Sequence, residues 1–238
     1  KMYISFDEYG VSFGQQGEVL FGRRGWQDVT KSYSQFRPRE NTFRKTDPTG
    51  SDMNMRRRPR MSQMLSALAT ASILLTFLRH ADRIKIGCMT GGISSAVAFD
   101  REKTWRNASY YPYAQLNQLS RGAVSLMPAI DSPTYNTEQY ALSDSCQCYA
   151  YEDVQSIESA VVHNEEKGEV SIFLINRAVE DDIEVTLDVR GFEGYKLAEH
   201  IEMYSDDLYA ENTYENPDTI KPLRNVDTKM EGGKVTAV

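Results

Sequence analysis

Cysteine, histidine and long apolar runs are all scarce in this sequence. Its three cysteines are too few for a disulfide framework, and Cys146 and Cys148 lack the paired spacing of a zinc site. The three histidines are scattered and predict no metal centre. No segment reaches the ~18 consecutive apolar residues of a membrane-spanning helix. We therefore expect free thiols in a reducing, cytoplasmic environment, with no metal and no membrane partner.

Basic residues are too few to balance the acidic ones, and the imbalance is uneven. The net charge is -7. Residues 151–238 hold eight basic and twenty-one acidic side chains, whereas residues 21–60 hold eleven basic and four acidic. An acidic second half makes nucleic acid an unsuitable partner for the chain as a whole. The hydrophobic content of 40% and charged content of 26% are those of an ordinary globular protein.

The first half of the chain predicts a βαβ unit. A short β-type run at residues 2–7 precedes a long basic stretch at 15–60, which we interpret as a loop because it lacks apolar periodicity. At residues 61–80, apolar side chains recur every three or four positions, as in a helix packed against a sheet. A second strand follows at 83–88. A strand–helix–strand crossover of this kind implies that the two strands are parallel.

The second half predicts an all-β domain that follows a short helix at residues 112–121. Strand-like runs at 159–163 and 170–175 flank a turn at 164–168 and predict a β-hairpin, with His163 exposed beside the turn. The other runs that we interpret as strands are 124–130, 183–189, 196–203 and one that opens within 232–238.

Two adjacent carboxylates end the first strand, in the run Ile4-Ser5-Phe6-Asp7-Glu8-Tyr9. In barrel enzymes, catalytic groups lie at the carboxyl ends of strands. Retaining glycosidases need two carboxylates about 5 Å apart, one as nucleophile and one as acid/base. Because neighbouring strand residues point to opposite faces, we do not expect Asp7 and Glu8 to form that pair. From the strand alone, Glu8 is either a catalytic group or a rim carboxylate.

The same run resembles the nucleophile strand of glycoside hydrolase family 51, the α-L-arabinofuranosidases, whose pattern is close to S-F-D-E-W-N. Further segments resemble that family in the same order along the chain. They are L-R-H-A-D-R-I-K-I at 78–86, W-R-N at 105–107 with Y-Y-P-Y at 110–113, D-S-P-T-Y at 131–135, N-E-E at 164–166, N-R at 176–177, E-H-I at 199–201, and E-N-T at 211–213 with E-N-P at 215–217.

The resemblance implies a fold in two parts. Residues 1–121 would be the end of a (β/α)8 TIM barrel, with barrel strands seven and eight at 2–7 and 83–88. Residues 122–238 would be a jelly-roll-like β-sandwich whose last strand is cut short. Because the family's acid/base glutamate ends strand four, which precedes this chain, we expect a C-terminal fragment that is inactive alone.

The resemblance also implies a chemistry. It indicates a retaining hydrolase that releases terminal α-L-arabinofuranosyl residues from arabinose-containing oligosaccharides or polysaccharides. Glu8 maps onto the nucleophile, which attacks the anomeric carbon and forms a covalent arabinosyl-enzyme. This mechanism needs no cofactor. The expected partner is the saccharide, and a homo-oligomer of the full-length parent is compatible with the sequence.

Several positions depart from the family pattern. Tyr9 stands where the family has Trp, and Gly10 stands where it has Asn. Gly91 replaces a Gln that resembles a sugar-contacting residue after strand eight, and the loop at 15–60 is longer than the family typically shows. These differences indicate a divergent branch with its own substrate preference.

Aromatic residues near these strand ends are the candidate sugar contacts. Tyr9 and Trp105 are the predicted substrate-binding residues, although Trp105 could equally be packed under its own loop. Tyr110 and Tyr111 are expected to pack against the helix at 112–121. Two other functions stay open: a related barrel glycosidase, such as an endoglucanase or xylosidase, and a noncatalytic carbohydrate-binding or assembly module built on the β-sandwich.

Overall fold

The computed structural model describes residues 2–9, 63–89, 96–99, 102–137, 140–143, 146–178, 181–224 and 228–237. The side chains of Asp7, Glu8 and residues 140–143 and 146–148 are outside this description, as are Gly10, Gly91 and the predicted loop at 15–60. The chain forms two compact units. The first comprises residues 1–11, 61–132 and 156–238, and the second comprises 12–60 and 133–155.

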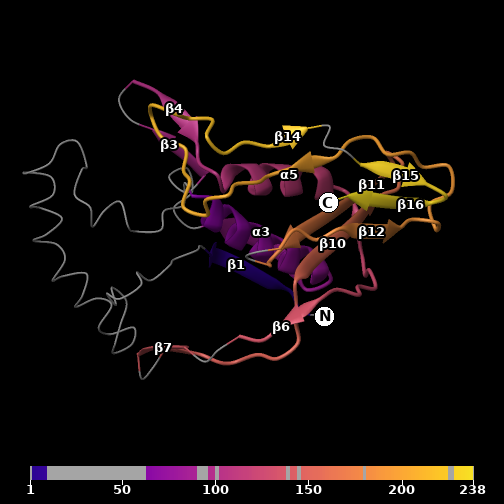
Figure 1. Cartoon of the computed structure of the whole chain (residues 1–238), viewed down its shortest axis with the longest axis horizontal. Coiled ribbons are helices and arrows are strands. Elements are labelled where there is room, and N and C mark those ends of the chain that lie inside the picture. The colour runs from indigo at the N-terminus through magenta and orange to yellow at the C-terminus, as the bar shows by residue number, and fades with distance from the viewer. Residues whose placement is uncertain are drawn as a thin grey trace, which may run out of the picture. The chain divides into compact units, whose positions relative to one another are not determined.

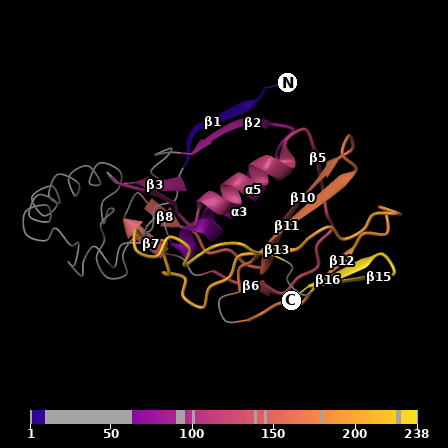
Figure 2. The same cartoon turned by 90° about the horizontal axis from the view of Figure 1, so that it is seen from above.

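The first unit contains the parallel βαβ arrangement that the sequence predicts. Strand β1 (Ile4–Tyr9), helix α3 (Met64–Arg79) and strand β2 (Ile84–Met89) follow one another. The two strands pair in parallel and run side by side (Figure 2). Asp7 and Glu8 lie inside β1 rather than at its end, which corrects the predicted strand at 2–7. The predicted helix at 61–80 is confirmed over 64–79.

The first turn of α3 is capped by the backbone of a segment far along the chain. Gln63 at the N-cap makes no side-chain capping bond. Instead, the amides of Met64 and Leu65 donate to the carbonyls of Ala210 and Leu208, at 3.0 and 2.9 Å. Since the first amides of a helix have no partner within it, this contact holds the start of α3 against the second half of the chain.

Helix α5 (Tyr110–Ser120) packs beside α3 and begins two residues before the predicted start at Pro112. Tyr111 is buried, which confirms its expected packing role. One apolar cluster lies where the two helices meet the sheet; it consists of Leu75, Leu116, Ala160 and Ile175. A second cluster, at the start of α3, consists of Met64, Ala67, Ala108 and Ile220.

The predicted β-hairpin is confirmed. Strand β10 (Ile157–Asn164) pairs antiparallel with β11 (Glu169–Asn176), and β5 (Val124–Leu126) pairs with the other edge of β10. The turn places Gly168 at a φ of 64°, where its amide donates to the Glu165 carbonyl at 3.3 Å. Glycine adopts this backbone conformation without steric cost, which explains its place in the turn. Residues 127–130 do not continue β5 as predicted.

His163 is half-buried, which corrects the prediction that it is exposed beside the hairpin turn. Its Nε2 lies 3.0 Å from the Tyr195 hydroxyl. Its ring also meets the ring of Phe192 edge to face, with centroids 5.4 Å apart. The residue is part of an aromatic cluster with Phe192 and Tyr195, which the hairpin pattern alone does not reveal.

Short antiparallel pairs make up the remainder of the first unit. The predicted strands at 183–189 and 196–203 are confirmed only over 185–188 and 201–202. The strands are β12 (Val185–Asp188), β16 (Lys234–Ala237) and β15 (Lys229–Glu231) in one sheet, β13 (Ile201–Glu202) with β14 (Leu223–Arg224), and β3 (Val97–Phe99) with β4 (Thr104–Arg106).

The second unit contains two antiparallel strand pairs in its described part. They are β6 (Thr134–Tyr135) with β9 (Val154–Gln155), and β7 (Tyr140–Ser143) with β8 (Cys146–Cys148). The sequence pattern predicts no strand here, because runs of two to four residues are too short to show alternation.

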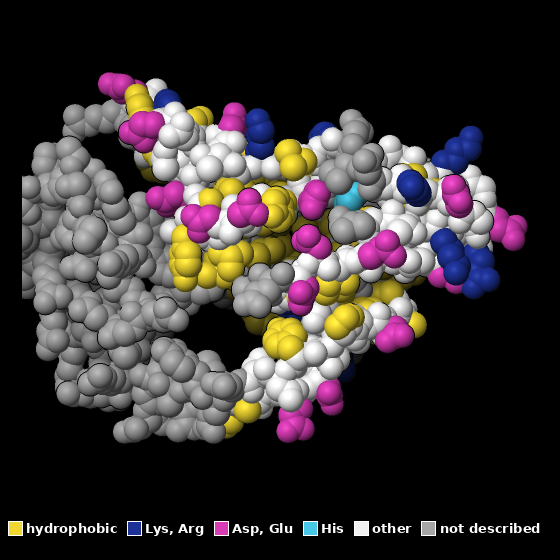
Figure 3. Space-filling model, in the orientation of Figure 1, with side chains coloured by type: hydrophobic (Ala, Val, Ile, Leu, Met, Phe, Trp, Pro, Cys, Tyr) yellow, Lys and Arg dark blue, Asp and Glu magenta, His cyan; other side chains and the backbone are white. Residues whose placement is uncertain are grey.

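Over its described residues, the chain is mostly sheet with few helices (Figure 1). Hydrophobic side chains gather over α3 in the space-filling view, and acidic side chains are scattered around them (Figure 3). Within the described ranges, no helix combines the length and apolar character needed to cross a membrane.

Candidate active-site strand and its surroundings

The predicted nucleophile, Glu8, lies at a break in the register of β1. Phe6 is paired with Gly87 and Tyr9 with Met89, so three steps along β1 match two steps along β2. The register shifts between Phe6 and Tyr9, as it also does between Ile4 and Ser5. We name the interval from Phe6 to Tyr9, which contains Glu8, the bulge of β1. Bulges occur often beside active sites, where they redirect a side chain.

Strict alternation of side chains ends at this bulge. Phe6 and Tyr9 would point to opposite faces of a regular strand, yet both rings pack on Phe77 of α3, with centroids 4.9 and 5.1 Å away. Alternation is therefore interrupted between Phe6 and Tyr9. The side chains of Asp7 and Glu8 are outside the described residues, so their expected placement on opposite faces stays a prediction.

Gly87 gives the Phe77 ring its room against the sheet. A methyl group on Gly87 would lie 2.6 Å from Cε2 of Phe77 and 3.6 Å from Cε1 of Tyr9. Carbon atoms in contact are normally about 3.5–4.0 Å apart, so any larger residue would push the Phe77 ring away. The absent side chain thus allows α3 to approach the two strands closely beside the bulge.

Tyr9, a predicted substrate contact, is half-buried against Phe77. Its hydroxyl is buried and finds no hydrogen-bond partner among the described residues. Burial raises the pKa of Tyr9 well above its usual range, and the nearby Tyr113 and Cys88 raise this pKa further. The phenol is therefore neutral at ordinary pH, and its ring helps to pack the end of β1.

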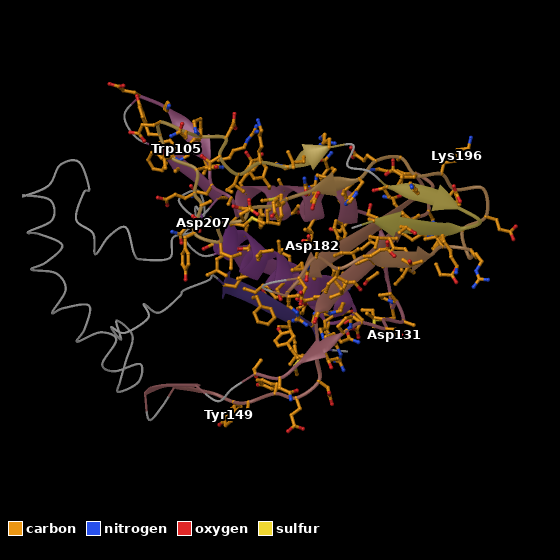
Figure 4. All side chains as sticks on the ribbon, viewed as in Figure 1. Trp105, Asp131, Tyr149, Asp182, Lys196 and Asp207 are labelled. Atoms are coloured by element: carbon orange, nitrogen blue, oxygen red, sulfur yellow. The ribbon has the colours of Figure 1, made fainter. Side chains whose placement is uncertain are left out.

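Trp105, the other predicted substrate contact, lies on β4 at the end of the first unit where α3 begins (Figure 4). Its Nε1 donates to the Asn212 carbonyl at 3.3 Å, and its ring meets Tyr214 edge to face at 6.0 Å. The Tyr214 hydroxyl in turn donates to Glu102 at 3.1 Å, and Lys103 lies over the Tyr214 ring. The indole is half-buried and is held by residues 212–214.

A buried carboxylate that the sequence analysis does not single out joins α3 to the sheet. The side chain of Glu158 on β10 is 5% exposed. Arg79 binds Oε1 at 2.6 Å, Ser72 donates to Oε2 at 2.5 Å, and Arg177 lies 3.5 Å from Oε2. A buried charge needs partners of this kind, so the four side chains, which we name the Glu158 cluster, act together. The hairpin pairs Ile157 with Asn176, so their sequence neighbours Glu158 and Arg177 lie close together. The predicted hairpin could therefore have indicated this one contact of the cluster.

Asn212 is a second buried polar residue with a structural role. It is 2% exposed. Its Nδ2 donates to the carbonyls of Arg106 and Ile220 at 2.9 and 2.8 Å, and its Oδ1 accepts from the Ile220 amide at 2.6 Å. The side chain thus ties the end of β4 to the segment before β14, close to the carbonyls that cap α3.

Comparison with known proteins identifies the family of this chain. The family profile described as Alpha-L-arabinofuranosidase C-terminal domain matches residues 7–238. The chain belongs to this family. The arabinofuranosidase C-terminal domain match begins inside β1, at Asp7, and extends over β2 and the antiparallel sheets. The family resemblance seen in the sequence is confirmed.

Two curated relatives show the extent of the match to the arabinofuranosidase family. The intracellular exo-α-(1→5)-L-arabinofuranosidase of Acetivibrio thermocellus is 35% identical over 176 residues, covering 72% of this chain and 32% of that protein. The intracellular exo-α-(1→5)-L-arabinofuranosidase 1 of Bacillus subtilis is 35% identical over 174 residues, with the same coverage of 72% and 32%. The chain spans about a third of the length of the curated relatives it matches.

Solved structures of arabinofuranosidases share the fold. A family 51 α-L-arabinofuranosidase from Bifidobacterium longum matches with a TM-score of 0.62 and 27% identity, over 74% of this chain and 32% of that one. A thermostable enzyme of the same family from Thermotoga petrophila matches in fold, with a TM-score of 0.60 and 17% identity, over 75% and 38% of the two chains. These family 51 enzymes carry a β-sandwich as their C-terminal domain, in line with the antiparallel sheets described above.

Proposed function

We propose that this chain supplies the nucleophile of a retaining α-L-arabinofuranosidase, which releases terminal α-L-arabinofuranosyl residues from arabinose-containing saccharides. Family membership and the names of the curated relatives support this activity. The observation that carries the proposal is the position of Glu8, in a bulge of a strand that pairs in parallel with β2. Glu8 is the last residue but one of β1, and catalytic groups of barrel enzymes lie near the carboxyl ends of the strands.

The same proposal covers the architecture. β1 and β2 would be barrel strands seven and eight, within a barrel end at residues 1–121, and residues 122–238 would be the β-sandwich. The parallel pairing of β1 and β2, with α3 as the crossover, supports this assignment. The acid/base carboxylate would come from an earlier barrel strand outside this chain, and the 238 residues would be inactive without it.

In the proposed reaction, the Glu8 carboxylate attacks the anomeric carbon while the acid/base carboxylic acid protonates the departing oxygen. The bond to the leaving group breaks as the covalent arabinosyl-enzyme forms. Water, deprotonated by the same acid/base residue, then attacks the anomeric carbon, and the bond to the Glu8 carboxylate breaks. This step frees the carboxylate and releases arabinose in the starting configuration. Two carboxylates about 5 Å apart suffice for both steps, so the mechanism needs neither metal nor cofactor.

Two observations support a proposed location for the parent protein. The Acetivibrio and Bacillus relatives are named intracellular enzymes. Cys88, whose side chain is described, is an exposed free thiol, as expected in a reducing compartment. We propose a cytoplasmic enzyme whose substrates are arabinose-containing oligosaccharides. Homo-oligomerisation of the parent protein stays a prediction.

The direct test is Glu8→Ala in the parent protein, assayed with an aryl α-L-arabinofuranoside. We expect kcat to fall by a factor on the order of 10⁴ or more, because the nucleophile is lost while the fold remains. Added azide should restore turnover of the activated substrate and give an arabinosyl azide of inverted configuration. Asp7→Asn is the matched control on the neighbouring carboxylate, and far-UV circular dichroism checks the fold.

Other outcomes assign the alternatives. Unchanged hydrolysis by the Glu8→Ala variant would rule out the nucleophile assignment. Hydrolysis of an aryl β-xyloside or a soluble β-glucan in place of the arabinofuranoside would indicate a related glycosidase. Saccharide binding without hydrolysis of any of these substrates by the parent protein would indicate a noncatalytic module.

A further inference from the structure

The bulge of β1 is held between two aromatic residues that share one support. Phe6 precedes the bulge and Tyr9 follows it, and both rings pack on Phe77 of α3 at 4.9 and 5.1 Å. The support itself is set close to the sheet by Gly87, on the facing strand. A shift of Phe77 would therefore move both ends of the segment that contains Glu8.

Helix α3 is fixed on both sides of this contact. Its first amides bond to the carbonyls of Leu208 and Ala210. At the other end, Arg79, two residues after Phe77, binds the buried carboxylate of Glu158 at 2.6 Å. Arg79 also donates to the Ser159 carbonyl at 3.0 Å. These anchors leave the helix little freedom to slide along its axis, so Phe77 presents its ring at one place on the sheet.

We propose that Phe77 and Gly87 are a positioning pair for Glu8: the ring sets the bulge, and the glycine gives the ring its place. The inference rests on the proposed function, because it assigns the pair a role in placing the nucleophile. Neither residue carries a group that takes part in the chemistry. They act by fixing the backbone of the segment that carries Glu8, since attack on the anomeric carbon requires a defined distance and angle.

The pair makes a prediction that simple packing does not. Phe77→Leu replaces the ring with a smaller aliphatic side chain, and Gly87→Ala places a methyl group where the Phe77 ring now lies. Each variant alone should lower kcat by about tenfold to a hundredfold with KM within about twofold, since displacement by ~1 Å has effects of this size. In the double variant, the methyl group occupies space that the ring has vacated, so kcat should recover at least in part.

The experiment measures kcat and KM of the parent protein and its variants, together with hydrogen exchange at the amides of residues 7–9. Exchange should be about tenfold faster in each single variant and should return toward the parent value in the double variant. Leu75→Ala is the matched control, since Leu75 lies on the same helix but packs against Leu116, Ala160 and Ile175. All assays run well below the unfolding temperature of each variant.

The outcomes separate this inference from the function on which it rests. Additive losses in the double variant, unchanged exchange at residues 7–9, or an equal loss of kcat in Leu75→Ala would each overturn the positioning role. A Glu8→Ala variant that still hydrolyses the substrate would instead reject the nucleophile assignment. Because exchange is measured without substrate, it reports on the bulge in either case.

Discussion

Helix α3 contacts the parallel strands and the antiparallel sheet through different sets of side chains. Toward the parallel strands it presents Phe77, whose ring packs on the rings of Phe6 and Tyr9. Toward the antiparallel sheet it presents Arg79 and Ser72, which bind a carboxylate that is 5% exposed. One helix therefore joins strands that it contacts through aromatic packing to a sheet that it contacts through both apolar packing, at Leu75, and a buried ion pair.

The difference shows how the two contacts divide their roles. Apolar packing has no fixed direction, so it sets the position of β1 only as closely as the shapes of Phe77 and Gly87 allow. Charged hydrogen bonds demand particular distances and angles, and a buried charge without its partner is costly. The Glu158 cluster is thus suited to fix α3, and the aromatic contact is suited to transmit that position to the bulge.

The largest expected effect comes from breaking the Glu158 cluster. Glu158→Ala leaves Arg79, Arg177 and Ser72 without their common acceptor. The loss of one partner of a buried ion pair costs about 3–5 kcal/mol. Since Arg79 and Arg177 are 26% and 31% exposed and can be partly solvated, we expect the lower end of that range. Urea unfolding of the parent protein measures the change.

The control for this prediction is an exposed ion pair on the same chain. Glu199 pairs with Arg224, and their side chains are 45% and 59% exposed. Glu199→Ala should change the free energy of unfolding by less than about 1 kcal/mol. If the Glu158 and Glu199 variants lose similar stability, burial of the carboxylate is not what makes the contact strong, and the comparison above fails.

Loss of a neutral buried hydrogen-bond network should destabilise the protein by an amount between those of the Glu158 and Glu199 variants. Asn212→Ala removes three hydrogen bonds and leaves two carbonyls and the Ile220 amide unsatisfied. Because each is a neutral group, we expect a loss of about 2–3 kcal/mol in the free energy of unfolding. Asn216→Ala, in the turn nearby, should cost less than about 0.5 kcal/mol. Equal losses in the two variants, measured by urea unfolding, would contradict the assignment.

The sequence predicts elements with long, regular patterns and misses what depends on contacts between distant segments. The periodicity of α3 and the hairpin of β10 and β11 are both read directly from the chain, and both are confirmed. The parallel pairing of β1 and β2 follows from the crossover rule. Short strands such as β6 to β9 are missed because two to four residues carry no detectable alternation.

The surroundings of the candidate site were harder to predict than its position. The run that contains Glu8 locates the strand, but the bulge arises from register with β2 and has no local sequence signal. Glu158 meets Arg79 across 79 positions of sequence, so only the folded chain brings them together. The role of Glu8 as nucleophile is predicted from the family resemblance. The residue pattern alone predicts only that a carboxylate lies on a strand.

The smallest expected effect concerns Asp188, an exposed counterpart of Glu158. The Arg190 guanidinium donates to both Asp188 carboxylate oxygens, at 2.9 Å from Nε to Oδ1 and 2.5 Å from Nη2 to Oδ2. These bonds, with one from the Arg190 amide, lower the pKa of Asp188 from 3.8 to about 2. Because the pKa is lower in the folded state, the stabilisation is complete above about pH 4 and is lost as pH falls through about 2.

A titration of the Asp188 carboxyl carbon by NMR should therefore have its midpoint near pH 2, and Arg190→Ala should move the midpoint back toward 3.8. The stability difference between the parent protein and Asp188→Asn should be small, because both side chains are largely exposed, and should vanish near pH 2. A midpoint that stays near 3.8 in the parent protein would show that this fork is not formed in solution. The contrast between buried and exposed carboxylates would then rest on Glu158 and Glu199 alone.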